Sequence, residues 1–261
     1  MDLKLRDRHV VIAGATGGLG SACARAFARE GAWLSLLGRS PDKLSTLVAE
    51  LGSGAGSAHA VTVDLTDAAS TDAAIAAAVR QHGPIDALIA CAGNAQGGIF
   101  TDLSDADWQR NLELKLFGTI RLLRSALPGM QARRSGRIVV IAGNSAKLPE
   151  PRMLPGAAAN SALLAIVRGL AEEIGPQGLC INAVNPGPVR SSRWDQQMAN
   201  IATQEKKSVA EIEAPFVAKS ALRKLASAEQ VADQVLFLAS ELAGHTTGTS
   251  IALDGGSVKT P

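Results

Sequence analysis

Three glycines that follow an apolar run are placed to bind the phosphates of a nucleotide. Val10–Ala13 is apolar and β-branched, as is typical of a buried strand, and Gly14, Gly18 and Gly20 come directly after it. Gly14 would allow a tight turn, while Gly18 and Gly20 would let backbone N–H groups approach a pyrophosphate at the positive end of the next helix. The spacing is G-x-x-x-G-x-G, and taken alone it also fits a strand-to-helix turn that binds nothing.

The other side chains that commonly do chemistry are scattered along the chain. Cys23, Cys91 and Cys180 are far apart in apolar surroundings, which predicts buried thiols rather than a disulfide or a zinc site. The four histidines are equally dispersed, so no metal site is expected. The first nine residues alternate charge with leucine and lack the apolar core of a signal peptide, and no run of 18 apolar residues occurs. We therefore expect a cytoplasmic location and no membrane span.

Composition narrows the class of partner. The chain has 261 residues, of which 46% are hydrophobic and 19% charged, as is typical of a protein with one well-formed core. It carries 26 basic and 24 acidic residues, for a formal net charge of +2. Such a balance offers no electrostatic basis for binding nucleic acid or a membrane surface, which leaves a small-molecule substrate.

The glycines must be positioned by a series of alternating strands and helices. The pattern shows no long linker and no repeat, and it predicts an α/β fold: one domain over residues 1–261, with a doubly wound parallel sheet covered by helices on both faces. Sites in such sheets lie beyond the carboxyl ends of the strands. Residues 191–225 have no clean period and are expected to form a lid. Strands are expected at 10–13, 33–37, 60–63, 85–91, 137–141, 180–185 and 249–253, and helices at 21–30, 42–51, 68–81, 105–130, 156–174 and 228–239.

Several further motifs, in order and at similar spacing, resemble those of the short-chain dehydrogenase/reductase family. The resemblance covers essentially the whole chain and implies a single-domain Rossmann-type fold, a nicotinamide dinucleotide as cofactor, and a homo-oligomer, most commonly a tetramer. Besides the glycine motif, the matching segments are Asp64-Leu65, Ala92-Gly93, Ile181 to Val189 (INAVNPGPV), Thr247-Gly248 and Asp254-Gly255-Gly256.

The resemblance assigns parts of the cofactor to particular residues. Asp64 would contact the adenine, Ala92 and Gly93 the ribose, the loop 186–189 the nicotinamide amide, and Ser191 the diphosphate. The full set of expected cofactor-binding residues is Gly14, Thr16, Gly18, Leu19, Gly20, Arg39, Ser40, Asp64, Leu65, Cys91, Ala92, Gly93, Lys115, Pro186, Gly187, Val189 and Ser191.

The end of the second expected strand predicts the cofactor type. An acidic residue there binds the adenosine ribose and repels a 2′-phosphate. This chain has Gly38 at that position and Arg39 beside it, and a guanidinium can pair with a phosphate. We therefore expect NADP(H) to be preferred over NAD(H), although Arg39 would also be compatible with a solvated loop.

The catalytic motif departs from the family. The family's Asn, Ser, Tyr and Lys positions fall on Lys115, Gly143, Gly156 and Asn160, and the chain contains no tyrosine. Segments 113–116 and 147–151 look like an atypical, 3-oxoacyl-reductase-like subset that also lacks the Tyr; within the second, Glu150 is expected to be a solvated charge. The remaining candidates for catalysis are Lys115, Asn144, Ser145 and Asn160.

Two functional hypotheses follow, with a third less supported. The first is an NADP(H)-dependent oxidoreductase that interconverts a carbonyl and a hydroxyl, possibly in a 3-oxoacyl substrate, with Lys115 or a water as proton donor. The second is a catalytically degenerate dehydrogenase that works as a cofactor- or ligand-binding module. A non-redox reaction in the same cleft is the third. Because Lys115 and Asn160 exchange the family's residue types, Lys115 is expected to take over the cationic role of the missing lysine.

Overall fold

The computed structural model describes residues 2–52, 57–93 and 97–259, and its centre is a seven-stranded parallel sheet. The strand order is β3-β2-β1-β4-β5-β6-β9, with every neighbouring pair parallel, so the predicted α/β fold is confirmed. All residues of β1, β4 and β6 are buried, and β1 and β4 are accordingly almost wholly apolar, whereas β6 also carries the buried Asn182 and Asn185. The strands are β1 (His9–Ala13), β2 (Trp33–Gly38), β3 (Ala58–Thr62), β4 (Ala87–Ala90), β5 (Gly136–Ile141), β6 (Leu179–Pro186) and β9 (Ser250–Leu253).

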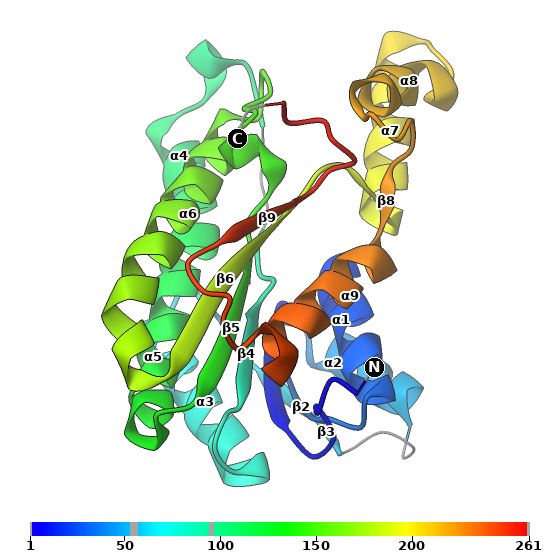
Figure 1. Cartoon of the computed structure of the whole chain (residues 1–261). Coiled ribbons are helices and arrows are strands. Elements are labelled where there is room, and N and C mark those ends of the chain that lie inside the picture. The colour runs from blue at the N-terminus through cyan, green and yellow to red at the C-terminus, as the bar shows by residue number, and fades with distance from the viewer. Residues whose placement is uncertain (1, 53–56, 94–96, 260–261) are drawn as a thin grey trace.

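Helices cover both faces of the sheet (Figure 1). One face carries α1 (Gly18–Arg29), α2 (Pro41–Leu51) and α9 (Ala228–Ala239). The other carries α3 (Ala68–His82), α5 (Gly118–Arg133) and α6 (Leu154–Ile174), with α4 (Asp105–Leu112) beside α6. This two-sided covering follows from the βα alternation that the sequence shows.

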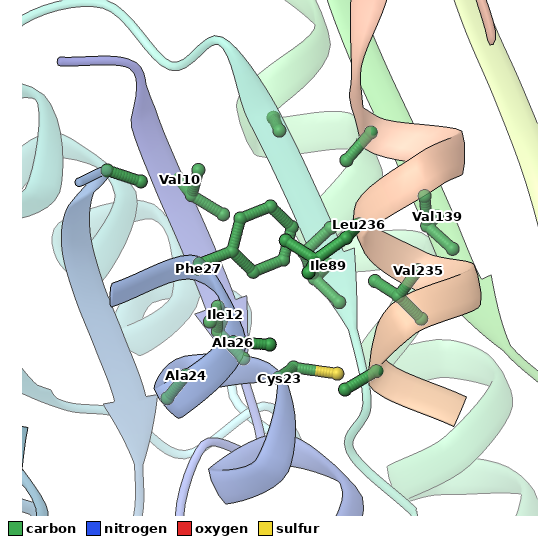
Figure 2. Close-up of a cluster of buried hydrophobic side chains, with 14 of the residues drawn as sticks. Val10, Ile12, Cys23, Ala24, Ala26, Phe27, Ile89, Val139, Val235 and Leu236 are labelled. Carbon is green, nitrogen blue, oxygen red and sulfur yellow. The ribbon is translucent and has the colours of Figure 1, made fainter. Parts of the chain in front are cut away.

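The core on the first face is built around Phe27, which is fully buried. Figure 2 shows its ring among Val10 of β1, Ile89 of β4 and Leu236 of α9. Because α1 and α9 share this cluster, residues more than 200 positions apart in the chain hold the glycine-rich turn of β1 against the middle of the sheet.

The predicted helix at 105–130 is helical throughout but is not uniformly an α-helix. The range 105–130 contains α4, then a π-helical turn η2 (Glu113–Phe117), then α5. A π-helical turn inserts one extra residue, and the apolar residues across it (Trp108, Leu112, Leu116, Ile120) are spaced by four, which an α-helix also allows, so the sequence pattern does not reveal the turn. Two other helices begin earlier than predicted, α1 at Gly18 and α6 at Leu154, and β4 is shorter than the predicted 85–91.

Residues 191–225 contain a helical hairpin, α7 (Ser192–Glu205) and α8 (Val209–Lys219), which stands apart from the sheet in Figure 1. Two short strands, β7 (Val189–Arg190) and β8 (Ala226–Ser227), pair at its base. The hairpin has a small core of its own around Met198, with Ile212 and Phe216 packed nearby. Arg190 at the start of the hairpin forms a bidentate ion pair with Glu213 of α8, with N···O distances of 2.6 and 2.9 Å.

The segment Leu154–Gln177 is long and apolar enough to pass a length and hydropathy test for a membrane span, with a mean hydropathy of 1.3. It begins with α6, whose Leu163, Val167 and Ile174 are buried in the core beneath the sheet. We conclude that this segment is a core helix of the fold and not a membrane span.

Candidate active site at the carboxyl edge of the sheet

Two adjoining hollows lie where the carboxyl ends of the strands meet the loops. Their volumes are about 330 and 360 Å³, and Gly17, Cys91 and Gly93 line both. The first brings together Gly14, Thr16, Arg39, Ser40, Leu65, Cys91, Ala92 and Gly93, and the second Gly18, Leu19, Gly20, Cys91, Gly93, Pro186, Gly187, Val189 and Ser191. Of the expected cofactor-binding residues, Asp64 and Lys115 alone line neither hollow directly.

The glycine-rich turn is compact enough to exclude larger residues at two positions. Gly14 has φ +77°, and a Cβ there would lie 2.8 Å from the backbone of Ala92. A Cβ on Gly20 would lie 2.1 Å from the carbonyl oxygen of Gly14. Gly18, in contrast, is exposed, and a Cβ added there would lie 3.5 Å from its nearest neighbour, Ser191 Cβ. Gly20 is thus required by packing inside the turn, and Gly18 faces the open hollow.

Helix α1 begins differently from most helices in the protein. In α2, α3, α4, α7, α8 and α9 a Ser or Asp side chain accepts a hydrogen bond from the first turn. In α1 the N-cap is Gly17, and no side chain of the described residues caps the helix. The N–H groups of its first turn therefore face the hollow with the positive end of the helix dipole, which is the arrangement that binds a diphosphate.

The outer end of the first hollow is basic. Arg39 follows β2 and is exposed, and Lys43 lies in the first turn of α2. Ser40 caps this helix by accepting from Lys43 N at 3.5 Å, as its position before Pro41 predicts. Among the described residues that line this hollow none is acidic. Sequence reasoning missed Lys43, although its place four residues after Arg39 at a helix start was available as a signal.

Asp64 is exposed and serves mainly as a turn residue. Its Oδ1 accepts hydrogen bonds from Thr66 N at 2.9 Å and Thr66 Oγ1 at 2.7 Å. These bonds, assisted by Arg39, hold the pKa of the Asp64 carboxyl below its ordinary value. Its carboxylate therefore stays ionised beside Leu65, which lines the first hollow.

The floor of both hollows holds a thiol that does not ionise readily. Cys91 is partly exposed here, so the prediction that all three cysteines are buried is wrong for this residue. Hydrogen bonding to the Cys23 thiol, together with burial, raises the pKa of Cys91 well above its ordinary value. Since the thiolate is the reactive form, Cys91 lies in the site as a neutral group.

Lys115 points into the site from the π-helical turn. Its side chain lies along Gly93, where an added Cβ would lie 3.0 Å from Lys115 Cδ. The ammonium Nζ donates to the carbonyl oxygen of Ala142, at the end of β5, over 3.0 Å. π-helical turns often occur at functional sites because they re-aim a side chain, and here the turn directs Lys115 across the cleft.

Asn160 projects from α6 and is hydrogen-bonded to the loop after β5. Its Nδ2 donates to Ser145 Oγ at 2.8 Å, and its buried Oδ1 has no hydrogen-bond partner among the described residues. A Cβ on Gly143 would lie 2.8 Å from Asn160 Nδ2, so the glycine makes room for this amide. Asn144 extends toward the loop after β6, with its Nδ2 3.4 Å from where a Cβ of Gly187 would be.

The helical hairpin reaches the site from the opposite side. Ser191, Trp194 and Gln197 line the second hollow; sequence reasoning identified the first of these and missed the other two. Glu150 is partly exposed and also paired, because Lys219 at the end of α8 donates to both of its oxygens at 2.7 and 2.9 Å. This ion pair links the proline-rich loop after β5 to the tip of the hairpin.

Comparisons with known proteins agree with this geometry. The family model for enoyl-(acyl carrier protein) reductase matches residues 14–258. The uncharacterized oxidoreductase YvrD of Bacillus subtilis is 32% identical, with 99% of each chain covered. The 2,3-dihydro-2,3-dihydroxybenzoate dehydrogenase of the same organism is 33% identical, with 97% of each chain covered.

Solved structures give the same result. The L-sorbose reductase of Gluconobacter frateurii, solved with NADPH and L-sorbose, superposes with a TM-score of 0.94 at 28% identity over 100% of both chains. A short-chain type dehydrogenase/reductase from Mycobacterium ulcerans superposes with a TM-score of 0.89 at 26% identity, covering 98% of this chain and 91% of that one. This chain belongs to the short-chain dehydrogenase/reductase family of oxidoreductases.

Proposed function

We propose that the protein is an NADP(H)-dependent oxidoreductase that interconverts a carbonyl and a hydroxyl without a tyrosine as proton donor. The observation that carries the proposal is the uncapped start of α1, which opens into a hollow whose outer end bears Arg39 and Lys43. Backbone N–H groups there suit the diphosphate, and the two cations suit a 2′-phosphate. The glycine turn, too tight for a side chain at Gly14, leaves the space that a dinucleotide needs.

The residues around the reacting end suggest a division of labour. Bound NADP(H) supplies or takes up the hydride. Ser145 Oγ accepts from Asn160 Nδ2, so its own hydrogen is available to donate to a substrate oxygen. Asn160 Oδ1 is buried and has no hydrogen-bond partner among the described residues, so the Asn160 side chain would have to rotate before this oxygen accepts from a hydroxyl such as one on the nicotinamide ribose.

We assign the proton to Lys115. In the reducing direction the substrate carbon gains a hydride and its oxygen gains negative charge that must be neutralised. Lys115 Nζ donates to Ala142, and the ammonium can deliver a proton to the substrate oxygen and be protonated again by water. If a water molecule is the proton donor instead, Lys115 has only the role of binding the ribose hydroxyls of the cofactor.

One observation favours a second function, that of a degenerate dehydrogenase acting as a binding module. The chain contains no tyrosine, so the family's usual proton donor is absent from every position. We place the chain in the atypical, 3-oxoacyl-reductase-like subset on this ground. In this second reading Lys115 and Asn160 hold the cofactor, and no turnover occurs.

The experiment that separates the two begins with fluorescence titration of NADPH and NADH. Quenching with neither would overturn both functions. NADPH oxidation is then followed with 3-oxoacyl thioesters, quinones, cyclic ketones and L-sorbose, the last because a structural relative was solved with it. Decay that is lost in Lys115→Met supports the enzyme. Tight NADPH binding with no decay on any of these supports the binding module.

We further propose a homotetramer in the cytoplasm. The warrant for both is the family resemblance. Light scattering at micromolar concentration is expected to give about four times the chain mass of 26.8 kDa. A monomer mass would overturn the proposal.

A further inference from the structure

A third hollow lies beside the cofactor cleft and has a different lining. It has a volume of about 690 Å³, within the range of small-molecule sites. One wall is the loop at 97–99, a second is Arg152 with Met153, and the third is helix α7. Gln197 lines both this hollow and the nucleotide hollow that contains the loop 186–189, so the two spaces meet there.

The α7 wall presents a row of amides. Gln196, Asn200 and Gln204 are spaced four residues apart on the helix, so they lie one above another on the same face, and all three line the hollow. Gln196 Nε2 donates to Asn200 Oδ1 at 3.1 Å, which orients the two amides. Each amide offers both donors and an acceptor at no net charge, and this combination matches a row of hydroxyl groups.

Arg152 supplies the only charge among the described residues that line the hollow. Its backbone is in the left-handed region, with φ +65°, where a non-glycine residue is strained. Its carbonyl accepts from Gly98 N at 2.8 Å, and a Cβ on Gly97 would lie 2.0 Å from that oxygen. The loop 97–98 therefore pins the arginine backbone at the mouth of the hollow.

The Arg152 guanidinium makes no salt bridge within the described part of the chain. Glu205, the carboxylate on α7 whose pKa it helps to lower, is already held by Lys207 at 2.8 Å. Arg152 thus keeps its charge for a ligand. The apolar residues Ile99, Met153 and Ile201 complete the lining and suit the C–H faces of a carbon chain.

We propose that this hollow binds the substrate, and that the substrate is a small polyhydroxylated anion. Its carboxylate or phosphate would pair with Arg152, its hydroxyls with the amide row, and its far end would reach the nicotinamide position past Gln197. This rests on the proposed function for the reaction, but the ligand class is argued from the hollow alone. A long acyl chain does not match this lining, because it would leave the amides unpaired.

The test is calorimetric titration of four ligands into the protein, with and without saturating NADPH: D-gluconate, sorbitol 6-phosphate, sorbitol and hexanoate. We expect at least one of the two polyhydroxylated anions to bind ten times more tightly than both sorbitol and hexanoate. The tighter of the two identifies the anion as carboxylate or phosphate. Equal or tighter binding of hexanoate, or of sorbitol, overturns the proposal.

Arg152→Gly tests the guanidinium without disturbing the backbone, since glycine adopts φ +65° without strain. We expect it to fold normally and to lose the tenfold preference for the anion over sorbitol. The matched control is Arg134→Gly: Arg134 is also a left-handed arginine (φ +53°), but it follows α5, far from the hollow. Asn200→Ala is expected to reduce the preference over hexanoate.

The outcomes distinguish this proposal from the proposed function. NADPH binding is measured separately by fluorescence. If NADPH does not bind but gluconate or sorbitol 6-phosphate does, and Arg152→Gly abolishes the preference, the ligand class stands and the cofactor function falls. If NADPH binds and the anions show no preference that depends on Arg152, the ligand class falls alone.

Discussion

The glycine turn and the wall formed by η2 and α6 face the same cleft but are built on different principles. At the glycine turn the backbone makes the site: N–H groups, a tight φ at Gly14 and the absence of a Cβ at Gly20. At the wall, side chains make the site: Lys115 reaches Ala142, and Asn160 reaches Ser145. A site built from backbone groups needs glycine at the closely packed positions, so its sequence motif can change little. A side-chain site can be rebuilt with different residues while the fold stays the same.

The largest effect that tests this contrast is expected at Lys115. Lys115→Met keeps the apolar stem along Gly93 and removes the charge. If the ammonium is the proton donor, turnover falls by about 10²–10⁴-fold, the range of a general acid, and NADPH affinity falls several-fold. The control is Lys147→Met, because Lys147 is an exposed lysine in the loop after β5, the strand that ends next to Ala142. Wild-type values for Lys115→Met would remove it from the site.

The next effect concerns cofactor choice. Arg39→Ala removes a charge-assisted contact worth roughly 1.5–3 kcal/mol, so NADPH affinity is expected to fall about ten- to a hundredfold while NADH affinity stays the same. Lys43→Ala should show a weaker version of this change. The measurement is fluorescence titration of both cofactors. Equal affinity of the wild type for NADPH and NADH would contradict the NADP(H) preference.

A third prediction tests the backbone site directly. Gly20→Ala places a Cβ 2.1 Å from the Gly14 carbonyl, and such overpacking costs about 1–3 kcal/mol of unfolding free energy. Thermal unfolding and NADPH titration should both register the change. Gly18→Ala, whose Cβ would lie at an ordinary contact distance of 3.5 Å from Ser191 Cβ, serves as the matched control and is expected to keep its stability. A Gly20→Ala protein as stable as the wild type would show that the turn is looser than its geometry indicates.

A smaller effect is expected far from the site, at the amino edge of the sheet. Burial lowers the pKa of both His9 and His82, and His59 and Asp86 are charged or titratable groups beside them. Because the folded pKa lies below the unfolded value of about 6.5, the unfolded chain binds more protons, and stability is lost as pH falls below that value. Tm should fall by a few degrees between pH 7 and pH 5. His82→Gln should reduce this fall and leave NADPH affinity unchanged.

The smallest effect tests whether the hairpin acts as a lid. NADPH is expected to slow hydrogen exchange in residues 191–225, since Ser191 and Gln197 line the nucleotide hollow. Glu150→Gln, which breaks an exposed ion pair worth roughly 0.2–1 kcal/mol, should speed exchange in α8 without NADPH. Exchange that is the same with and without NADPH would count against a lid.

The sequence predicts the part of the site that the backbone builds better than the part that side chains build. The strands and the glycine turn could be predicted, because burial on both faces gives apolar runs and only glycine fits at Gly14. The π-helical turn could not, since the spacing of four between the apolar residues around it also occurs in an ordinary α-helix. Nor could the contact of Lys219 with Glu150, 69 residues away, because exposed ion pairs carry no sequence pattern.

The fit between Gly143 and Asn160 has a consequence for how mutations at the two positions combine. A serine at 143 would place its Cβ 2.8 Å from Asn160 Nδ2, so the Asn160 amide would have to move to make room for it. Changing Asn160 removes the donor to Ser145. The two substitutions are therefore epistatic, and their effects should not add in a double-mutant cycle. The effect of a substitution at either position therefore depends on which residue occupies the other.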